Sequence, residues 1–244
     1  MKRYIRLLPN MRHLGKEKKG TTLVETMVTL FLISIMMAMA ASALSSASKI
    51  FVRIQKEQYA QSILDTTMTE LRNITNDASG YVKIYPAGTG FSVGAKGSKN
   101  GRVLEFLNPE GYVVMVSQDG CKETQIYIGD NMTGTSDEVE KGQLLTRYYF
   151  RNSNTGTYVY QKGSQLVARA VAPAFGKGFY MKNYLDIHYS VPKDTPDGST
   201  VNSVVATVTL YSDKDRTNVV ATDSETLEFR QPLTYKEAVT AIKE

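Results

Sequence analysis

The sequence predicts an α+β protein in which one long N-terminal helix, first transmembrane and then amphipathic, packs on an antiparallel β-sheet head. Neither Gly nor Pro occurs from Thr21 to Ser79, no charged residue occurs from Thr26 to Ser48, and short β-type segments follow Gly80. We therefore expect a leader at 1–20, a transmembrane half-helix at 21–48, an amphipathic half-helix at 49–79, an extracytoplasmic β-rich head at 80–232, and a short C-terminal helix or tail at 233–244.

The leader accounts for the basic character of the chain. The formal net charge is +5, but the first twenty residues hold seven Lys or Arg against one acid, Glu17, which leaves 22 basic and 23 acidic residues from Thr21 onward. A mature protein close to neutrality has no general attraction for phosphates, so we do not expect a nucleic-acid partner.

The apolar run is long enough to cross a bilayer. Its 23 residues from Thr26 to Ser48 form a helix of roughly 35 Å, against a hydrocarbon layer of about 30 Å. The basic residues before it place the N-terminus in the cytoplasm and the head outside, as a single-pass protein. The expected span begins with Thr22, Leu23, Val24, Met27, Val28, Leu30, Phe31, Leu32 and Ile33.

One carboxylate, Glu25, stands at the cytoplasmic end of this run. An unpaired charge in the membrane part of a helix costs on the order of 2.5–3.5 kcal/mol. Cleavage between Gly20 and Thr21 would create an amino group one helical turn before Glu25, and the two charges could then pair within or between subunits. A helix N-terminus also favours a nearby anion.

The run Lys18-Lys19-Gly20-Thr21-Thr22-Leu23-Val24-Glu25, followed by an unbroken apolar helix, resembles the processing site of type IV pilins and pseudopilins. The resemblance implies a pilin-like fold, cleavage after Gly20 by a prepilin peptidase, and methylation of the Thr21 amine. It also implies that Glu25 neutralises the terminal amine of a neighbouring subunit during assembly. The implied partners are other pilin subunits, through a helix bundle, together with an assembly platform and its ATPase.

Two other readings of the N-terminus stay open. A secretory signal peptide would also have a basic start and an apolar middle, with cleavage sites at Ala38-Met39-Ala40 or Ala41-Ser42-Ala43. A plain single-pass anchor would keep the leader. A mature N-terminus at Thr21 favours the pilin-like reading, whereas a start at Ala41 or Leu44 would exclude it.

Beyond Ser48 the helix becomes amphipathic and should end near Asn76 and Gly80. Its expected apolar stripe recurs at helical steps and comprises Ile50, Ile54, Gln61, Leu64, Met68 and Leu71. Most major pilins carry Gly and Pro in the apolar half, where this chain has Ser34 and Ser42. This favours a straighter helix and a minor rather than a bulk filament subunit.

The head reads as a succession of strands. They are expected at 81–85, 102–107, 112–117, 125–128, 144–150, 157–161, 165–171, 185–191, 204–211 and 217–230, the last broken near Asp223. Asn108-Pro109-Glu110-Gly111 predicts a type I turn, and apolar alternation in the late strands predicts one buried and one exposed face. Thr234 to Glu237 fits a capping box that would open a helix to Lys243.

The order of elements from Leu144 onward, with a Tyr-Tyr-Phe strand, a Tyr-Val-Tyr strand, and Gln-Leu-Val-Ala-Arg169-Ala-Val, is similar to W-type minor pilins and J-type pseudopilins. Since Cys121 is the only cysteine, no intrachain disulfide can form. We expect its thiol to be buried, and an intermolecular disulfide is the alternative.

The sequence contains few residues that could form a catalytic site, so we expect a non-enzymatic protein without cofactor or metal. His13 lies in the leader, and His188 is expected as an exposed strand residue rather than a base. Asp213, Asp215, Asp194 and Asp197 read as turn residues, not as a calcium loop. An aromatic and basic surface for single-stranded nucleic acid is a weaker alternative; it would use Tyr148, Tyr149, Tyr158, Tyr160, Tyr180, Tyr184 and Tyr189 with their neighbouring cations.

The sequence therefore predicts a minor pilin or pseudopilin, which joins or primes a type IV pilus-like or secretion filament at the cell surface. The alternative is a membrane-tethered extracellular binding domain with an uncleaved anchor.

Overall fold

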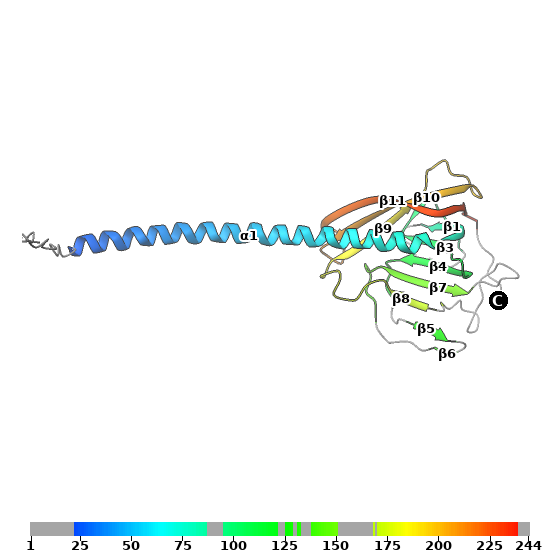
Figure 1. Cartoon of the computed structure of the whole chain (residues 1–244), viewed down its shortest axis with the longest axis horizontal. Coiled ribbons are helices and arrows are strands. Elements are labelled where there is room, and N and C mark those ends of the chain that lie inside the picture. The colour runs from blue at the N-terminus through cyan, green and yellow to red at the C-terminus, as the bar shows by residue number, and fades with distance from the viewer. Residues whose placement is uncertain are drawn as a thin grey trace, which may run out of the picture. The chain divides into compact units, whose positions relative to one another are not determined.

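The computed structural model describes residues 22–86, 95–121, 125–128, 131–132, 138–150, 168 and 170–238. The chain divides into two compact units, Met1–Arg53 and Ile54–Glu244. Within the described residues, one helix and eleven strands form an α+β arrangement consistent with a pilin-like fold, as the sequence predicts (Figure 1).

Helix α1 runs without interruption from Leu23 to Asn76. It starts and ends within three residues of the predicted bounds, and Gly80, at φ 71°, lies where the chain turns into the first strand. Its buried residues all belong to the second unit: Ala60, Ile63, Leu64, Thr67, Met68, Leu71 and Thr75. The predicted stripe is thus correct at Leu64, Met68 and Leu71, but wrong at Ile50, Ile54 and Gln61, which are exposed.

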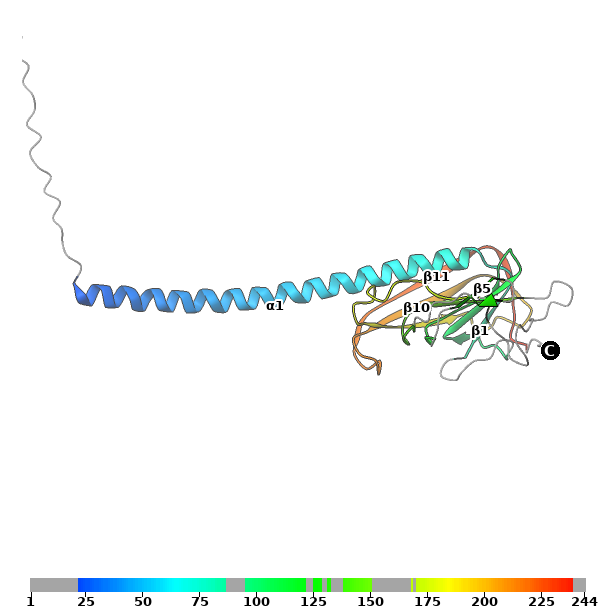
Figure 2. The same cartoon turned by 90° about the horizontal axis from the view of Figure 1, so that it is seen from below.

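The eleven strands belong to one sheet, ordered β2-β9-β10-β11-β1-β3-β4-β7-β8-β5-β6. They are β1 Ser79–Tyr85, β2 Asn100–Gly101, β3 Val103–Leu107, β4 Tyr112–Ser117, β5 Gln125–Ile128, β6 Asn131–Met132, β7 Leu145–Phe150, β8 Ala170–Pro173, β9 Tyr184–Ser190, β10 Thr200–Tyr211 and β11 Val219–Tyr235. The pairing is antiparallel except between β1 and β11. Residues 54–76 of α1 run along one side of the strands (Figure 2).

The predicted strands are largely confirmed, and β4 and β5 have the expected bounds. The β3–β4 turn is also confirmed, since Gly111 N–H donates to the Asn108 carbonyl at 3.0 Å. The strand expected at 157–161, and most of the strand expected at 165–171, lie outside the described residues. β11 continues past Asp223, where a break was predicted, and contains Pro232 beside an irregular stretch of its pairing with β10.

The expected C-terminal helix from Thr234 is wrong at its start, because Thr234 and Tyr235 are the last residues of β11. They pair in parallel with Tyr81 and Val82 of β1, and Lys236 N–H then donates to the Val82 carbonyl at 3.0 Å. A capping box is a weak local preference, and pairing with a buried strand overrides it. Residues 239–244 lie outside the described residues.

The main core lies between the buried face of α1 and the inner face of the sheet, and it includes Leu64, Leu71, Val82, Phe106 and Leu210. A second core, with Tyr85, Met115 and Tyr149, covers the opposite face of the central strands. One polar, exposed face is therefore the correct expectation for β10, where burial alternates, but not for β1, β3 and β4, which are buried on both faces.

Candidate functional site

The start of α1 is organised by Thr22. Its hydroxyl accepts a hydrogen bond from the Glu25 N–H at 3.3 Å, and its carbonyl accepts one from the Thr26 N–H at 3.1 Å. Thr22 is thus the N-cap, and Glu25 occupies the third helical position, the arrangement of a Thr-x-x-Glu capping box. This signal is present in the sequence but was not used in the prediction. The carboxylate also lies where the helix dipole favours an anion.

Every described residue of the first unit is exposed. The large apolar side chains among them are at least 42% exposed and include Leu23, Val24, Met27, Val28, Leu30, Phe31, Leu32, Ile33, Ile35, Met36, Met37, Met39, Leu44, Ile50, Phe51 and Val52. α1 is the one helix of the described residues that is long and apolar enough to cross a bilayer. Such an exposed apolar length requires lipid or other helices around it.

Hydroxyl groups within the apolar segment bond to their own helix. Thr26 donates to the Leu23 carbonyl, Thr29 to the carbonyls of Glu25 and Thr26, and Ser34 to the Leu30 carbonyl, all at 2.8–2.9 Å. These three hydroxyls therefore have hydrogen-bond acceptors within their own helix and need none from outside it. They are compatible with an apolar environment around the helix.

The structure describes Thr22, Glu25 and all the predicted span residues as parts of this segment, whereas Gly20 and Thr21 lie outside the described residues. A shallow groove along one helix face is lined by Ala41, Leu44, Ser45, Ser48, Lys49 and Val52, and three of these residues, Ala41, Ser45 and Ser48, are small. Small side chains of this kind let a second helix approach closely.

The described part of the head holds a buried charge cluster, centred on Asp186, that the sequence did not indicate. The Asp186 carboxylate is almost fully buried and accepts hydrogen bonds from Arg102 at 2.9 Å, Arg216 at 3.1 Å and Gln118 at 3.2 Å. His188 Nε2 lies 3.5 Å from the same carboxylate and is exposed, as predicted for a strand residue. These contacts join β9 to three other segments, which is a structural role.

Other groups that could carry chemistry also have structural explanations. Asp213 accepts hydrogen bonds from the N–H groups of Thr217 and Asn218, which confirms it as a turn residue, and these bonds hold the pKa of its carboxyl below the usual value. Within the described residues, no group of three or more His, Cys, Asp or Glu could hold a metal. Cys121 is half-buried, so its predicted burial is only partial.

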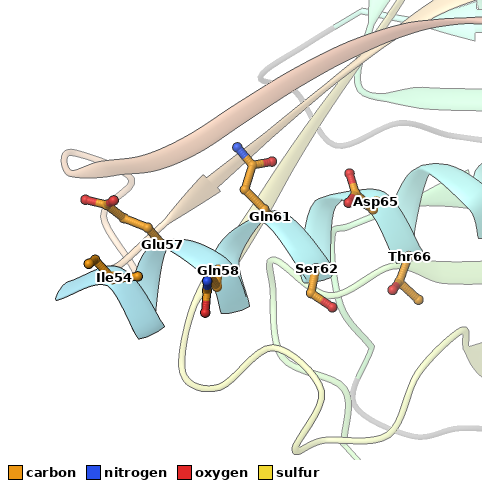
Figure 3. A pocket seen from close by; sticks show the side chains of 7 residues that line it. All are labelled: Ile54, Glu57, Gln58, Gln61, Ser62, Asp65 and Thr66. Atoms are coloured by element: carbon orange, nitrogen blue, oxygen red, sulfur yellow. The ribbon is translucent and has the colours of Figure 1, made fainter. Parts of the chain in front are cut away.

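A hollow of about 500 Å³ lies on α1 in the second unit and is lined by Ile54, Glu57, Gln58, Gln61, Ser62, Asp65 and Thr66. Figure 3 shows Glu57, Gln61 and Asp65 on one side of the helix and Gln58, Ser62 and Thr66 on the other. Because every lining residue comes from the same helix, nothing converges on a common point. The hollow is a helix surface rather than an enclosed site.

Three tyrosines of the alternative aromatic surface for nucleic acid are buried in the cores and are not available to bind a base. Tyr149, Tyr180 and Tyr189 are buried, and Tyr180 packs edge-on against Phe179 with ring centroids 5.0 Å apart. Tyr158 and Tyr160 lie outside the described residues. The remaining described rings, Tyr148 and Tyr184, are half-buried.

The fold and the exposed segment together define a class: an α+β head continuous with a long apolar N-terminal helix that fits membrane anchoring. Residues 15–41 match the family model described as the prokaryotic N-terminal methylation motif. This motif is the signature of type IV pilins and pseudopilins, and the chain carries it. Neither a curated protein nor a solved structure matches the chain.

Proposed function

We propose that the protein is a minor pilin or pseudopilin, a structural subunit that joins or primes a type IV pilus-like or secretion filament. The observation that carries the proposal is the methylation motif at 15–41, which overlaps the part of α1 whose described residues, 22–53, are all exposed. The motif supports a pilin-type subunit, and a structural subunit needs no catalytic centre.

In this proposal a prepilin peptidase cleaves after Gly20 and the new Thr21 amine is methylated. Before assembly the apolar helix spans the membrane, with its N-terminus in the cytoplasm and the head outside. The assembly platform and its ATPase then extract the subunit, and its helix joins a bundle of pilin helices. The positive-inside rule supports this orientation, because Lys16, Lys18 and Lys19 precede the span.

Glu25 directs assembly in this proposal. The capping arrangement fixes it in the first turn of α1, four residues after the proposed new amine. An unpaired carboxylate moved into an apolar bundle costs on the order of 2.5–3.5 kcal/mol, so pairing with the terminal amine of a neighbour favours the correct axial position.

Two measurements test the proposal. N-terminal sequencing of the mature protein should give Thr21, whereas retention of the whole leader would favour a tethered binding domain, and a start at Ala41 or Leu44 a signal peptide. Separately, Glu25→Ala should be processed and reach the membrane, yet disappear from filaments sheared off the cells. Glu110→Ala removes an exposed carboxylate from the β3–β4 turn and should leave incorporation unchanged. Undiminished incorporation of Glu25→Ala would refute the assembly role.

A further inference from the structure

The described part of the head exposes few large apolar side chains, and these lie at one end of it. They are Ile54 and Tyr59 of α1, Met181 in the loop between β8 and β9, and Val219 and Val220 of β11. The other large apolar side chains described from Ala60 onward are buried or half-buried. We call the exposed set the apolar end of the head.

The strand register brings Met181 and Val219 to the same end of the sheet. Tyr184 of β9 pairs with Tyr211 of β10, and Tyr211 pairs with Val219 of β11. Adjacent strands are about 4.8 Å apart, so Tyr184 and Val219 are about 10 Å apart across the sheet. Met181 comes three residues before Tyr184, in the loop that leads into β9 (Figure 1).

Helix α1 enters the head at this end. It runs in the same direction as β11, because β1 follows α1 directly and pairs with the last residues of β11. Further back, Arg72 of α1 pairs with Glu225 of β11. Val219 lies six residues before Glu225, about 20 Å along the strand, and this length equals about 13 residues of helix. Counted back from Arg72, it leads to the level of Tyr59.

The loop that carries Met181 is anchored in the main core. The rings of Phe175 and Phe179 stack with centroids 4.0 Å apart and pack against that core, and the buried Tyr180 lies edge-on to both. Met181 is 54% exposed, and Lys182 after it is exposed as well. No acidic residue occurs from 174 to 185. The loop therefore presents an apolar side chain followed by a cation on a fixed aromatic base.

The proposed membrane span keeps this end of the head close to a bilayer. Ile54 follows Ser48, the last residue of the uncharged run, by six residues of continuous helix, which rise about 9 Å. The head-group layer is about 5–7 Å thick on each side of the hydrocarbon, so Ile54 stands only a few ångström beyond it. Membrane helices tilt by about 20° on average, which is enough to bring one side of such a head to the lipid.

We propose that, in the membrane-anchored protein before assembly, the apolar end of the head rests on the lipid surface. Met181 enters the boundary between head groups and acyl chains, and Lys182 lies at the lipid phosphates. This inference rests on the membrane span of the proposed function. Lipid fits better than another protein, because the short connection holds the apolar end beside the bilayer at a high effective concentration.

The test uses tryptophan as a reporter, since the protein contains none. The full chain carrying Met181→Trp is placed in nanodiscs of phosphatidylcholine and phosphatidylglycerol, with a single chain in each disc. The reporter should lose about half of its emission when the lipids carry bromine near the start of their acyl chains, because an interfacial side chain lies about 5–10 Å into that boundary.

Two further reporters serve as controls. Glu110→Trp is exposed in the β3–β4 turn, at the opposite end of the sheet, since Leu107 before that turn pairs with Ser79 just after α1; it should not be quenched. Phe31→Trp lies in the span and should be quenched. Absence of quenching at Phe31→Trp would refute the span itself. Quenching there without quenching at Met181→Trp would refute only the contact of the head with lipid.

Tryptophan itself favours a membrane interface, so the wild-type protein is measured as well. Amide exchange at residues 176–183 should be about threefold slower or more in the nanodiscs than in an amphipathic polymer, while residues 108–111 should not change. Met181→Asp combined with Lys182→Glu should abolish this protection. Equal exchange in the two media would overturn the proposal. Protection that requires several chains in one disc would also overturn it, because the apolar end would then bind a second copy.

Discussion

The buried N–H of Leu144 donates a hydrogen bond of 2.9 Å to the hydroxyl of Tyr180, which joins the start of β7 to the loop between β8 and β9. Tyr189 offers the natural contrast. Its hydroxyl is equally buried in the main core but has no hydrogen-bond partner among the described residues. Burial raises the pKa of both hydroxyls well above the ordinary value.

Replacing Tyr180 or Tyr189 by Phe should therefore have opposite effects on the free energy of unfolding. Tyr180→Phe leaves the Leu144 N–H without an acceptor and should lower the free energy of unfolding by about 1–3 kcal/mol. Tyr189→Phe removes a hydroxyl that gains nothing from burial, so it should be neutral or raise stability by up to about 1 kcal/mol. Urea unfolding followed by near-ultraviolet circular dichroism measures both. An equal loss in the two variants would contradict the contrast.

A second prediction concerns the cap of α1. Thr22→Ala removes the hydroxyl acceptor of the Glu25 N–H, which keeps the Thr22 carbonyl at 3.0 Å. It should destabilise the first turn by about 0.5–1 kcal/mol, which corresponds to roughly two- to fivefold faster amide exchange there. Thr22→Ser keeps an acceptor and should exchange nearly as the wild type does. The exchange of amides after Thr29 serves as the internal reference, and equal exchange of the two variants would exclude the cap.

How far the sequence predicts the structure depends on whether the deciding contact is local. The Gly- and Pro-free run predicts α1, and apolar alternation predicts β9 and β10, because each pattern lies within the element that it predicts. The local pattern around Thr234 favours a helix cap, but pairing with Tyr81 of β1 decides the outcome. The parallel pairing of β1 with β11 joins two distant strands, and no single segment encodes it.

The candidate site shows the same division. Glu25 lies in the first turn of α1 and the exposed apolar run follows it, an order that is visible in one segment of the sequence. The partners of Asp186 come from three other parts of the chain, so alternation predicted an exposed position where the structure has a buried one. Only the fold brings these groups together.

That cluster gives a third prediction. Asp186→Asn keeps the shape but removes the charge that faces Arg102 and Arg216, whose side chains are 31% and 19% exposed. Loss of one partner of a fully buried pair costs 3–5 kcal/mol, and partial solvent access reduces this to about 2–3 kcal/mol. Asp194→Asn, in the exposed loop after β9, should stay within about 0.5 kcal/mol. Equal unfolding midpoints for the two variants would show that the cluster adds no stability.

The last prediction follows from Lys83, a fully buried lysine on β1 beside Glu105 of β3. Its ammonium donates to the Ala238 carbonyl at 2.7 Å, and Glu105 accepts hydrogen bonds from Tyr81 and Tyr85. Burial lowers the pKa of Lys83 below 10.5, and this outweighs the opposing effect of the Glu105 charge.

The lowered pKa of Lys83 makes the stability of the protein depend on pH. Between the lowered pKa of the folded state and 10.5, the unfolded chain holds a proton on Lys83 that the folded chain has lost, so unfolding takes up a proton. Stability from Lys83 therefore rises as pH rises through this window. The wild-type protein should gain stability relative to Lys83→Met as pH increases from about 7 to about 10.

The stability of Lys83→Met is measured relative to that of the wild type because the buried tyrosines, which both proteins contain, titrate in the opposite sense. Their raised pKa values make the folded state less stable above about pH 10, equally in wild type and variant, so this contribution cancels. Lys56→Met, which replaces an exposed lysine of α1, should show a difference from wild type that does not change with pH. A pH-independent difference for Lys83→Met as well would mean that Lys83 keeps its ordinary pKa in the folded protein, and that its contact with Ala238 fully offsets the cost of burying the charge.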